Sequence, residues 1–152
     1  MIYLILVLIY VAFDQLTKWL IVNNIAYGSS ITLCDCLNIV HMTNTGVAFS
    51  MFQGINAVFT VLTASVVIGV MLFISRYKHE LTKLQMHSMI LVASGGIGNL
   101  IDRIFRGAVI DFIDVGYKTF YRWPSFNVAD SCVCIGVSIF IISMFFQKNK
   151  KS

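Results

Sequence analysis

The sequence predicts an integral membrane protein with four transmembrane helices and a small β-sheet outside the bilayer. Hydrophobic residues make up 58% of its 152 residues and charged residues only 12%, whereas soluble domains average about 25% charged residues. Four separate apolar stretches are long enough to cross a bilayer, which takes about 20 residues. The length fits a single domain over residues 1–152. The net charge of +4 comes without a basic and aromatic platform, so nucleic-acid binding is not indicated.

The first transmembrane helix is expected over residues 1–22. This stretch lacks the basic amino-terminal region of a signal peptide, and Asp14 and Lys18 interrupt its apolar run. We therefore expect a retained helix rather than a cleaved leader. Asp14 and Lys18 are spaced to meet on one helix face, so a purely structural ion pair is one interpretation of them.

A polar segment over residues 23–54 follows, and we expect it to lie outside the membrane. Residues 32–34 and 37–41 are typical of short strands between turns. Residues 44–50 carry a turn signal followed by an apolar patch. The segment therefore predicts a small extramembrane sheet and not a fifth span.

Three further helices are expected over residues 55–75, 84–104 and 128–146. Small residues at positions 94–98 would let neighbouring helices approach the third helix closely. Residues 107–126 read as a loop rich in aromatic side chains, which favour the membrane interface.

Lysine and arginine residues indicate the orientation of the four helices. They gather in the loop between the second and third helices and in the carboxyl-terminal tail, at Arg76, Lys78, Lys83, Lys148, Lys150 and Lys151. These two segments lie on the same side of a four-span protein, so the positive-inside rule predicts that both termini are cytoplasmic. The polar segment 23–54 and the aromatic loop 107–126 would then face outward.

Polar side chains that are distant in sequence are expected to meet at the outer membrane boundary. The carboxylates are Asp14, Asp102, Asp111 and Asp130, and the amides are Asn44, Asn99 and Asn127. Ionisable groups at membrane depth are costly to keep there, so by default they indicate a functional site. Packing alone does not account for their convergence.

Asp111 and Asp130 are the predicted catalytic pair. Two carboxyl groups close together in a partly dry site do not both ionise easily, so they titrate as a unit. An aspartic protease uses such a pair, with the ionised member activating water and the protonated member polarising the scissile carbonyl. Asp102, beside Arg103, reads equally well as a structural ion pair, and Asp114 as a solvated loop carboxylate.

Other protease chemistries find less support in the sequence. It has no His-Glu-x-x-His zinc motif, and no metal site is expected. A Ser–Lys dyad that uses Lys18 stays open. The pairs Cys34/Cys36 and Cys132/Cys134 are spaced too closely for a usual zinc site. The second pair reads as small buried hydrophobic residues, whereas the first could be free or linked to a partner.

Five segments carry a family resemblance that covers essentially the whole chain. They are Asp14-Gln-Leu-Thr-Lys18, Asn44-Thr-Gly-Val-Ala-Phe49, Gly95-Gly-Ile-Gly-Asn-Leu-Ile-Asp-Arg103, Val109-Ile-Asp111-Phe and Phe126-Asn-Val-Ala-Asp130-Ser. Together and in this order, they resemble the prolipoprotein signal peptidases, the signal peptidase II family.

The resemblance implies an aspartic endopeptidase of the bacterial inner membrane. Such an enzyme removes signal peptides from diacylglyceryl-modified prolipoproteins by cleaving just before the lipidated cysteine. Asp111 and Asp130 match its catalytic pair. Positions that line the site and hold the substrate backbone are matched by Asn44, Asn99, Arg103 and Asn127, and supporting positions by Asp14, Lys18 and Asp102.

The family fold implied by the resemblance has four helices, an outer β-cradle, and a short extracytoplasmic helix in the loop between the third and fourth spans. The resemblance also implies inhibition by the cyclic peptide globomycin and no metal or organic cofactor. We expect a monomer surrounded by membrane lipid, with the loop over residues 107–126 as a lid above the cleft.

Two functions from other classes are the alternatives. A small proton-coupled transporter also needs a carboxylate inside the membrane, but it would more naturally hold that acid at mid-depth. A membrane scaffold without catalytic activity would not need paired acids beside three asparagines.

Overall fold

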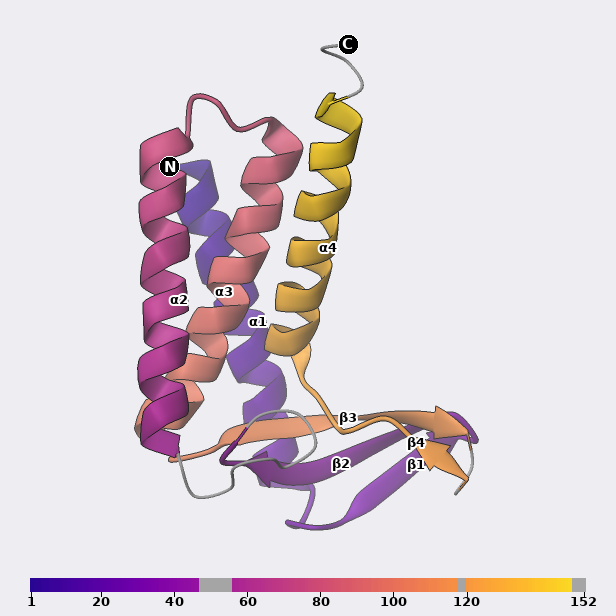
Figure 1. The fold of residues 1–152 in the computed structure, drawn as a ribbon. Coiled ribbons are helices and arrows are strands. Elements are labelled where there is room, and N and C mark those ends of the chain that lie inside the picture. The colour runs from indigo at the N-terminus through magenta and orange to yellow at the C-terminus, as the bar shows by residue number, and fades with distance from the viewer. Residues whose placement is uncertain (47–55, 118–119, 149–152) are drawn as a thin grey trace.

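The computed structural model describes residues 1–46, 56–117 and 120–148, which form a bundle of long helices with a β-sheet at one end (Figure 1). The helices are α1 (Ile2–Asn24), α2 (Asn56–Tyr77), α3 (Lys83–Phe105) and α4 (Val128–Lys148). All four are long and apolar enough to cross a membrane, so the predicted helices are confirmed. The beginning of α1 and the end of α4 lie at the end of the bundle away from the sheet (Figure 1).

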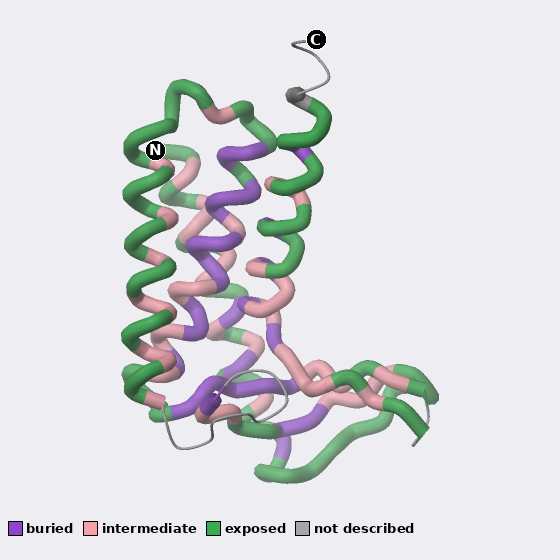
Figure 2. Tube along the Cα trace, viewed as in Figure 1, coloured by how far each residue is buried: buried purple, intermediate pink, exposed green. Residues whose placement is uncertain are grey.

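Helix α3 is the core of the bundle. Its most apolar stretch is 56% buried, against 11%, 6% and 17% for those of α1, α2 and α4. It contacts each of the other three helices, and Figure 2 shows its buried positions running the length of the bundle. The other helices turn large apolar side chains outward, as expected of surfaces that face lipid tails.

The small residues of α3 allow this close packing. A Cβ atom on Gly95 would lie 2.3 Å from the carbonyl oxygen of Ala129, and one on Gly98 would lie 2.6 Å from Oδ2 of Asp14. Glycine at these two positions lets α4 and α1 approach the backbone of α3. The packing role predicted for residues 94–98 is therefore confirmed.

The sheet has four antiparallel strands in sequence order. They are β1 (Ser30–Cys34), β2 (Leu37–Asn44), β3 (Val109–Tyr117) and β4 (Tyr121–Arg122). The strands predicted over residues 32–34 and 37–41 are confirmed, and both are longer than predicted. Most of the apolar patch predicted over residues 44–50 lies outside the described residues.

The expectation of a loop over residues 107–126 is wrong, because the segment is largely strand. The short helix expected there is not seen in its described parts, residues 107–117 and 120–126. Strand β3 is rich in β-branched and aromatic residues, which suit a half-buried sheet surface. It also pairs with β2, whose edge would otherwise stay open.

Candidate active site

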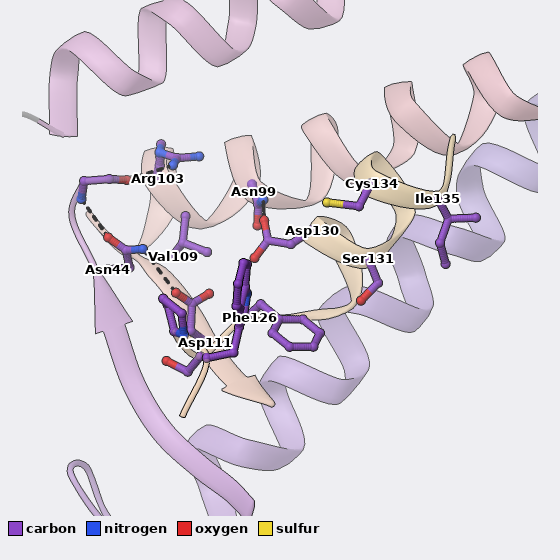
Figure 3. A pocket seen from close by; sticks show the side chains of 14 residues that line it. Asn44, Asn99, Arg103, Val109, Asp111, Phe126, Asp130, Ser131, Cys134 and Ile135 are labelled. Carbon is purple, nitrogen blue, oxygen red and sulfur yellow. Dashed lines mark hydrogen bonds between the residues drawn. The ribbon is translucent and has the colours of Figure 1, made fainter. Parts of the chain in front are cut away.

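A cavity of about 580 Å³ lies where the sheet meets α3 and α4, and both predicted catalytic residues line it (Figure 3). Asp111 comes from β3 and Asp130 from the first turn of α4. Asn44 of β2 and the α3 residues Asn99 and Arg103 line the same cavity. The structure thus brings together polar groups from four elements that are far apart in the sequence.

Strand pairing sets the position of Asp111. The register between β2 and β3 shifts between Ile39 and Met42, so that Met42 lies opposite Asp111. Irregularities of this kind bend a strand and redirect its side chains. Asn44, at the end of β2, donates a hydrogen bond from Nδ2 to Oδ2 of Asp111 over 3.2 Å.

Asp114 has a different environment on the same strand. Nε of Arg122 lies 2.7 Å from its Oδ2, and Nδ2 of Asn38 donates to the same oxygen over 3.0 Å. Asp114 does not line the cavity. The structure therefore separates the two carboxylates of β3, with Asp111 in the cavity and Asp114 in an ion pair.

Asn127 connects the two predicted catalytic residues and is fully buried, with 0% of its surface exposed. Its Nδ2 donates to Oδ1 of Asp111 over 2.8 Å. Its Oδ1 accepts from the backbone N–H of Asp130 over 2.9 Å, and its own backbone N–H donates to Oδ2 of Asp130 over 3.3 Å. The same residue therefore begins α4, as asparagine often does at a helix start, and fixes that helix to β3.

Asp130 receives its closest side-chain hydrogen bond from α3. Nδ2 of Asn99 donates to Oδ1 of Asp130 over 2.7 Å. Oδ1 of Asn99 in turn accepts from Nζ of Lys18 over 3.1 Å. The amide of Asn99 is thereby held in one orientation, with its N–H toward the carboxylate.

The protonation of Asp111 is shifted toward the physiological pH range. Its side chain is almost completely buried, with 3% of the residue exposed. Burial, and then the charge of Asp130, raise the pKa of Asp111 to about 7, although hydrogen bonds from Asn44 and Asn127 oppose the shift. A carboxyl group in this condition can hold a proton near neutral pH and donate it.

Behind the cavity lies a cluster of buried ions, formed by Asp14, Lys18 and Asp102. Their exposed fractions are 1%, 0% and 0%. Nζ of Lys18 lies 2.9 Å from Oδ2 of Asp14 and 2.7 Å from Oδ2 of Asp102. Arg106 adds a second cation that contacts Asp102, so the two carboxylates are neutralised by two cations.

The ion cluster also holds the backbone beside each predicted catalytic residue. Oδ1 of Asp14 accepts a hydrogen bond from the N–H of Ala129 over 2.9 Å, directly before Asp130. Oδ2 of Asp102 accepts from the N–H of Ile110 over 3.2 Å, directly before Asp111. The cluster therefore positions both segments without entering the cavity lining.

The sequence did not reveal the partners of Asp102 and Arg103. Asp102 pairs with Lys18 and Arg106, and no ion pair with its neighbour Arg103 is found among the described residues. Arg103 points its guanidinium to the carbonyl oxygen of Gly46 over 3.4 Å. Within the described residues, its buried Nε has no hydrogen-bond partner.

Several lining residues were not singled out as site residues from the sequence. They are Val109, Trp123, Pro124, Ser125, Phe126, Ser131, Cys134 and Ile135. The signal for Ser131, Cys134 and Ile135 was their spacing after Asp130, which places them on the same side of α4. Among the described residues, no group of three or more His, Cys, Asp or Glu side chains is arranged to hold a metal ion.

Comparison with known families identifies this arrangement. Residues 6–146 match the family model described as signal peptidase (SPase) II. The chain belongs to the signal peptidase II family. Two similar relatives are named lipoprotein signal peptidase. That of Halalkalibacterium halodurans is 40% identical over 99% of this chain and 96% of its own length. That of Bacillus subtilis is 40% identical over 99% and 97%.

Solved structures agree with this membership of the signal peptidase II family. One, described as a bacterial membrane enzyme, superposes with a TM-score of 0.87 and is 30% identical, over 99% of this chain and 91% of that one. A second has a TM-score of 0.80 and 31% identity, over 93% and 91%. The chain is therefore a multi-pass bacterial membrane enzyme of the lipoprotein signal peptidase class, as the sequence resemblance implied.

Proposed function

We propose that Asp111 and Asp130 are the catalytic pair with which this signal peptidase II cleaves prolipoproteins. The observation that carries the proposal is the single side chain of Asn127, which contacts both residues within one cavity. The two carboxyl groups come from different elements, β3 and α4. Two buried carboxyl groups held close together are electrostatically unfavourable, so their pairing indicates chemistry that needs both.

In the proposed mechanism the two acids have different starting states. Asp111, with its pKa raised to about 7 by burial and by the charge of Asp130, carries the proton. Asp130 is the carboxylate, and the N–H donors of Asn99 and Asn127 stabilise its negative charge. Asp130 takes a proton from the attacking water while Asp111 polarises the scissile carbonyl, and the proton then passes to the leaving amine.

Four polar residues are proposed to hold the substrate backbone or the catalytic carboxylates. Asn44, Asn99 and Arg103 line the cavity, whereas Asn127 is buried outside its lining and acts through its contacts with Asp111 and Asp130. Asn44, Asn99 and Asn127 already bind the catalytic carboxylates, so they are proposed to keep them oriented as the substrate enters. Arg103 has a buried Nε without a partner among the described residues. We assign the guanidinium of Arg103, which lines the cavity, to a substrate carbonyl oxygen, since a cationic N–H donor binds such an oxygen strongly.

The proposed substrate is a prolipoprotein whose cysteine carries diacylglycerol, cut just before that cysteine. The cavity runs along α4 past Cys134 and Ile135, and its lining is mostly apolar. The acyl chains can therefore stay in the bilayer while the scissile bond reaches Asp111 and Asp130. Neither the activation of water by Asp130 nor the polarisation of the carbonyl by Asp111 calls for a metal or organic cofactor.

The proposed location is the bacterial cytoplasmic membrane, with the site at its outer leaflet and both termini in the cytoplasm. The basic loop between α2 and α3 lies at the end of the bundle opposite the sheet (Figure 1), which supports this orientation under the positive-inside rule. We further propose that the chain acts as a monomer, that globomycin blocks it, and that the segment over residues 107–126 is the lid, with Trp123 and Phe126 facing the cavity.

Cleavage of a diacylglyceryl-modified precursor in detergent tests the proposal. Asp111→Asn and Asp130→Asn keep the shape of the side chain but remove its acid–base function, so each should lower the rate by at least about 100-fold. Asp114→Asn is the matched control, because it changes the same chemical group outside the cavity. If either of the first two variants is folded and cleaves at the wild-type rate, the assigned pair is wrong.

A further inference from the structure

The turn between β1 and β2 carries two thiols that the peptidase site does not use. Cys34 ends β1, and Cys36 lies in the turn before β2 begins. Both are free and exposed, and their Sγ atoms lie 2.9 Å apart. A disulfide bond is about 2.05 Å long, so an approach of about 0.9 Å would join the two sulfur atoms.

We infer that Cys34 and Cys36 form a reversible dithiol–disulfide pair, an oxidation site on the sheet that is separate from the catalytic cavity. Neither residue lines that cavity. The backbone already holds the turn, because the carbonyl oxygen of Cys36 accepts a hydrogen bond from the N–H of Gly116 on β3 over 2.9 Å. The bond can therefore form with little movement beyond rotation of the two side chains.

The electrostatic environment makes the two thiols unequal. The hydrogen bond between the two thiols, in which either sulfur can donate, lowers the pKa of Cys34 and raises the pKa of Cys36. The thiolate is the nucleophile in thiol–disulfide exchange. The lower pKa favours Cys34 as the first nucleophile, and the remaining thiol then closes the intramolecular bond.

The oxidant is a disulfide, either a small molecule or an exposed disulfide of another protein. The Cys34 thiolate attacks one of its sulfur atoms, forms a mixed disulfide and releases the first thiol, which takes up a proton. Cys36 then loses its proton, attacks the sulfur of Cys34 and releases the second thiol. The oxidant gains two electrons and two protons, and the pair loses them.

This disulfide bond would be labile and would contribute little to the stability of the fold. It closes a loop of only three residues, and the stabilisation from a disulfide grows with the length of the loop. Disulfides that are strained or exposed to solvent exchange readily. The proposed orientation puts the sheet outside the cytoplasm, where disulfides persist, but the exchange chemistry does not depend on peptidase activity.

The chain contains its own matched control. Cys132 and Cys134 have the same spacing, but they lie on α4, where side chains two residues apart point about 200° away from each other. Cys132 is also buried. Cys134 is exposed, but the two thiols should not form a disulfide with each other under conditions that oxidise the pair on the sheet.

The test uses the full chain in detergent, fully reduced, freed of reductant, and then treated with oxidised glutathione. Remaining thiols are alkylated and counted by intact and peptide mass spectrometry. The wild type should lose two of its four alkylatable thiols, with the loss at Cys34 and Cys36 and no glutathione retained. Cys36→Ser should instead retain one glutathione on Cys34.

The double variant Cys34→Ser/Cys36→Ser should form no intramolecular disulfide, whereas Cys132→Ser/Cys134→Ser should still form one. The inference is overturned if no intramolecular disulfide forms in the wild type, if Cys34 and Cys36 each retain a stable glutathione, or if an intramolecular disulfide still forms in the Cys34→Ser/Cys36→Ser variant. Because the readout is mass, it is independent of whether Asp111 and Asp130 are the catalytic pair.

Discussion

Replacing Lys18 by methionine is the sharpest test of the buried ion cluster. The change keeps most of the side-chain volume but removes an ammonium group that contacts Asp14 at 2.9 Å, Asp102 at 2.7 Å and Asn99 at 3.1 Å. Lys18 has no exposed surface, so water cannot replace the lost charge. The two carboxylates would share a single remaining cation, Arg106.

The expected cost is that of breaking a buried ion pair, about 3–5 kcal/mol. Folded domains are stable by only about 5–15 kcal/mol, so Lys18→Met should lower the unfolding midpoint strongly without necessarily preventing folding. Unfolding in detergent, followed by circular dichroism against denaturant, measures the change. Lys78→Met is the matched control, because Lys78 is exposed in the turn after α2, and its effect should stay within about 0.5 kcal/mol.

A double variant tells electrostatics apart from lost packing. Adding Asp14→Asn to Lys18→Met removes one of the two negative charges and leaves Asp102 paired with Arg106. If uncompensated charge is the cause, the double variant should be more stable than Lys18→Met alone, with a coupling energy above about 1 kcal/mol. A Lys18→Met variant as stable as the wild type, or two effects that simply add, would refute this reasoning.

Three further predictions concern the cavity and the helix packing. Because burial and the charge of Asp130 raise the pKa of Asp111 to about 7, its proton, and with it the cleavage rate, should be lost as the pH rises through about 7. The stability that this raised pKa contributes is fully present below the ordinary carboxyl pKa of about 4 and is lost as the pH rises from there to about 7, so Asp111→Asn should flatten the stability profile over that range. A rate that stays constant from pH 6 to pH 9 would contradict the assignment of the proton. Gly95→Val should destabilise the protein by about 1–3 kcal/mol or more, because a Cβ atom there meets the carbonyl oxygen of Ala129 at 2.3 Å, whereas Gly69→Ala, with no neighbour within 4 Å, should be neutral or stabilising in a thermal unfolding assay. Cys134→Trp should fill the cavity that Cys134 lines and block cleavage in a folded protein, while Cys134→Ser should stay active; full activity of the tryptophan variant would place the substrate elsewhere.

The helices could be predicted from the sequence because lipid imposes a simple rule on them. A span needs a long apolar run with its backbone hydrogen bonds satisfied internally, and each of α1 to α4 has such a run. Strand β3 was missed because its aromatic and apolar residues fit the membrane interface equally well. Its assignment depends on pairing with β2, a contact between segments far apart in the sequence.

The convergence of the site could also be predicted, because the order of the four predicted spans places Asp111 and Asp130 at the same end of the helix bundle. The contacts that organise them could not. Depth and spacing say nothing of side-chain direction, so the link from Lys18 through Asn99 to Asp130 appears only in the structure. The same holds for Asp102, whose partners are set by helix packing and not by its neighbour in sequence.

The double contact of Asn127 has a consequence for what an activity assay reports. One amide cannot keep its bonds to Asp111 on β3 and Asp130 on α4 if the sheet moves away from the bundle. Sheets and helices of one protein can separate locally at a lower free energy than global unfolding requires. Loss of cleavage on heating would then mark the undocking of the sheet, at a temperature below that at which the helices melt.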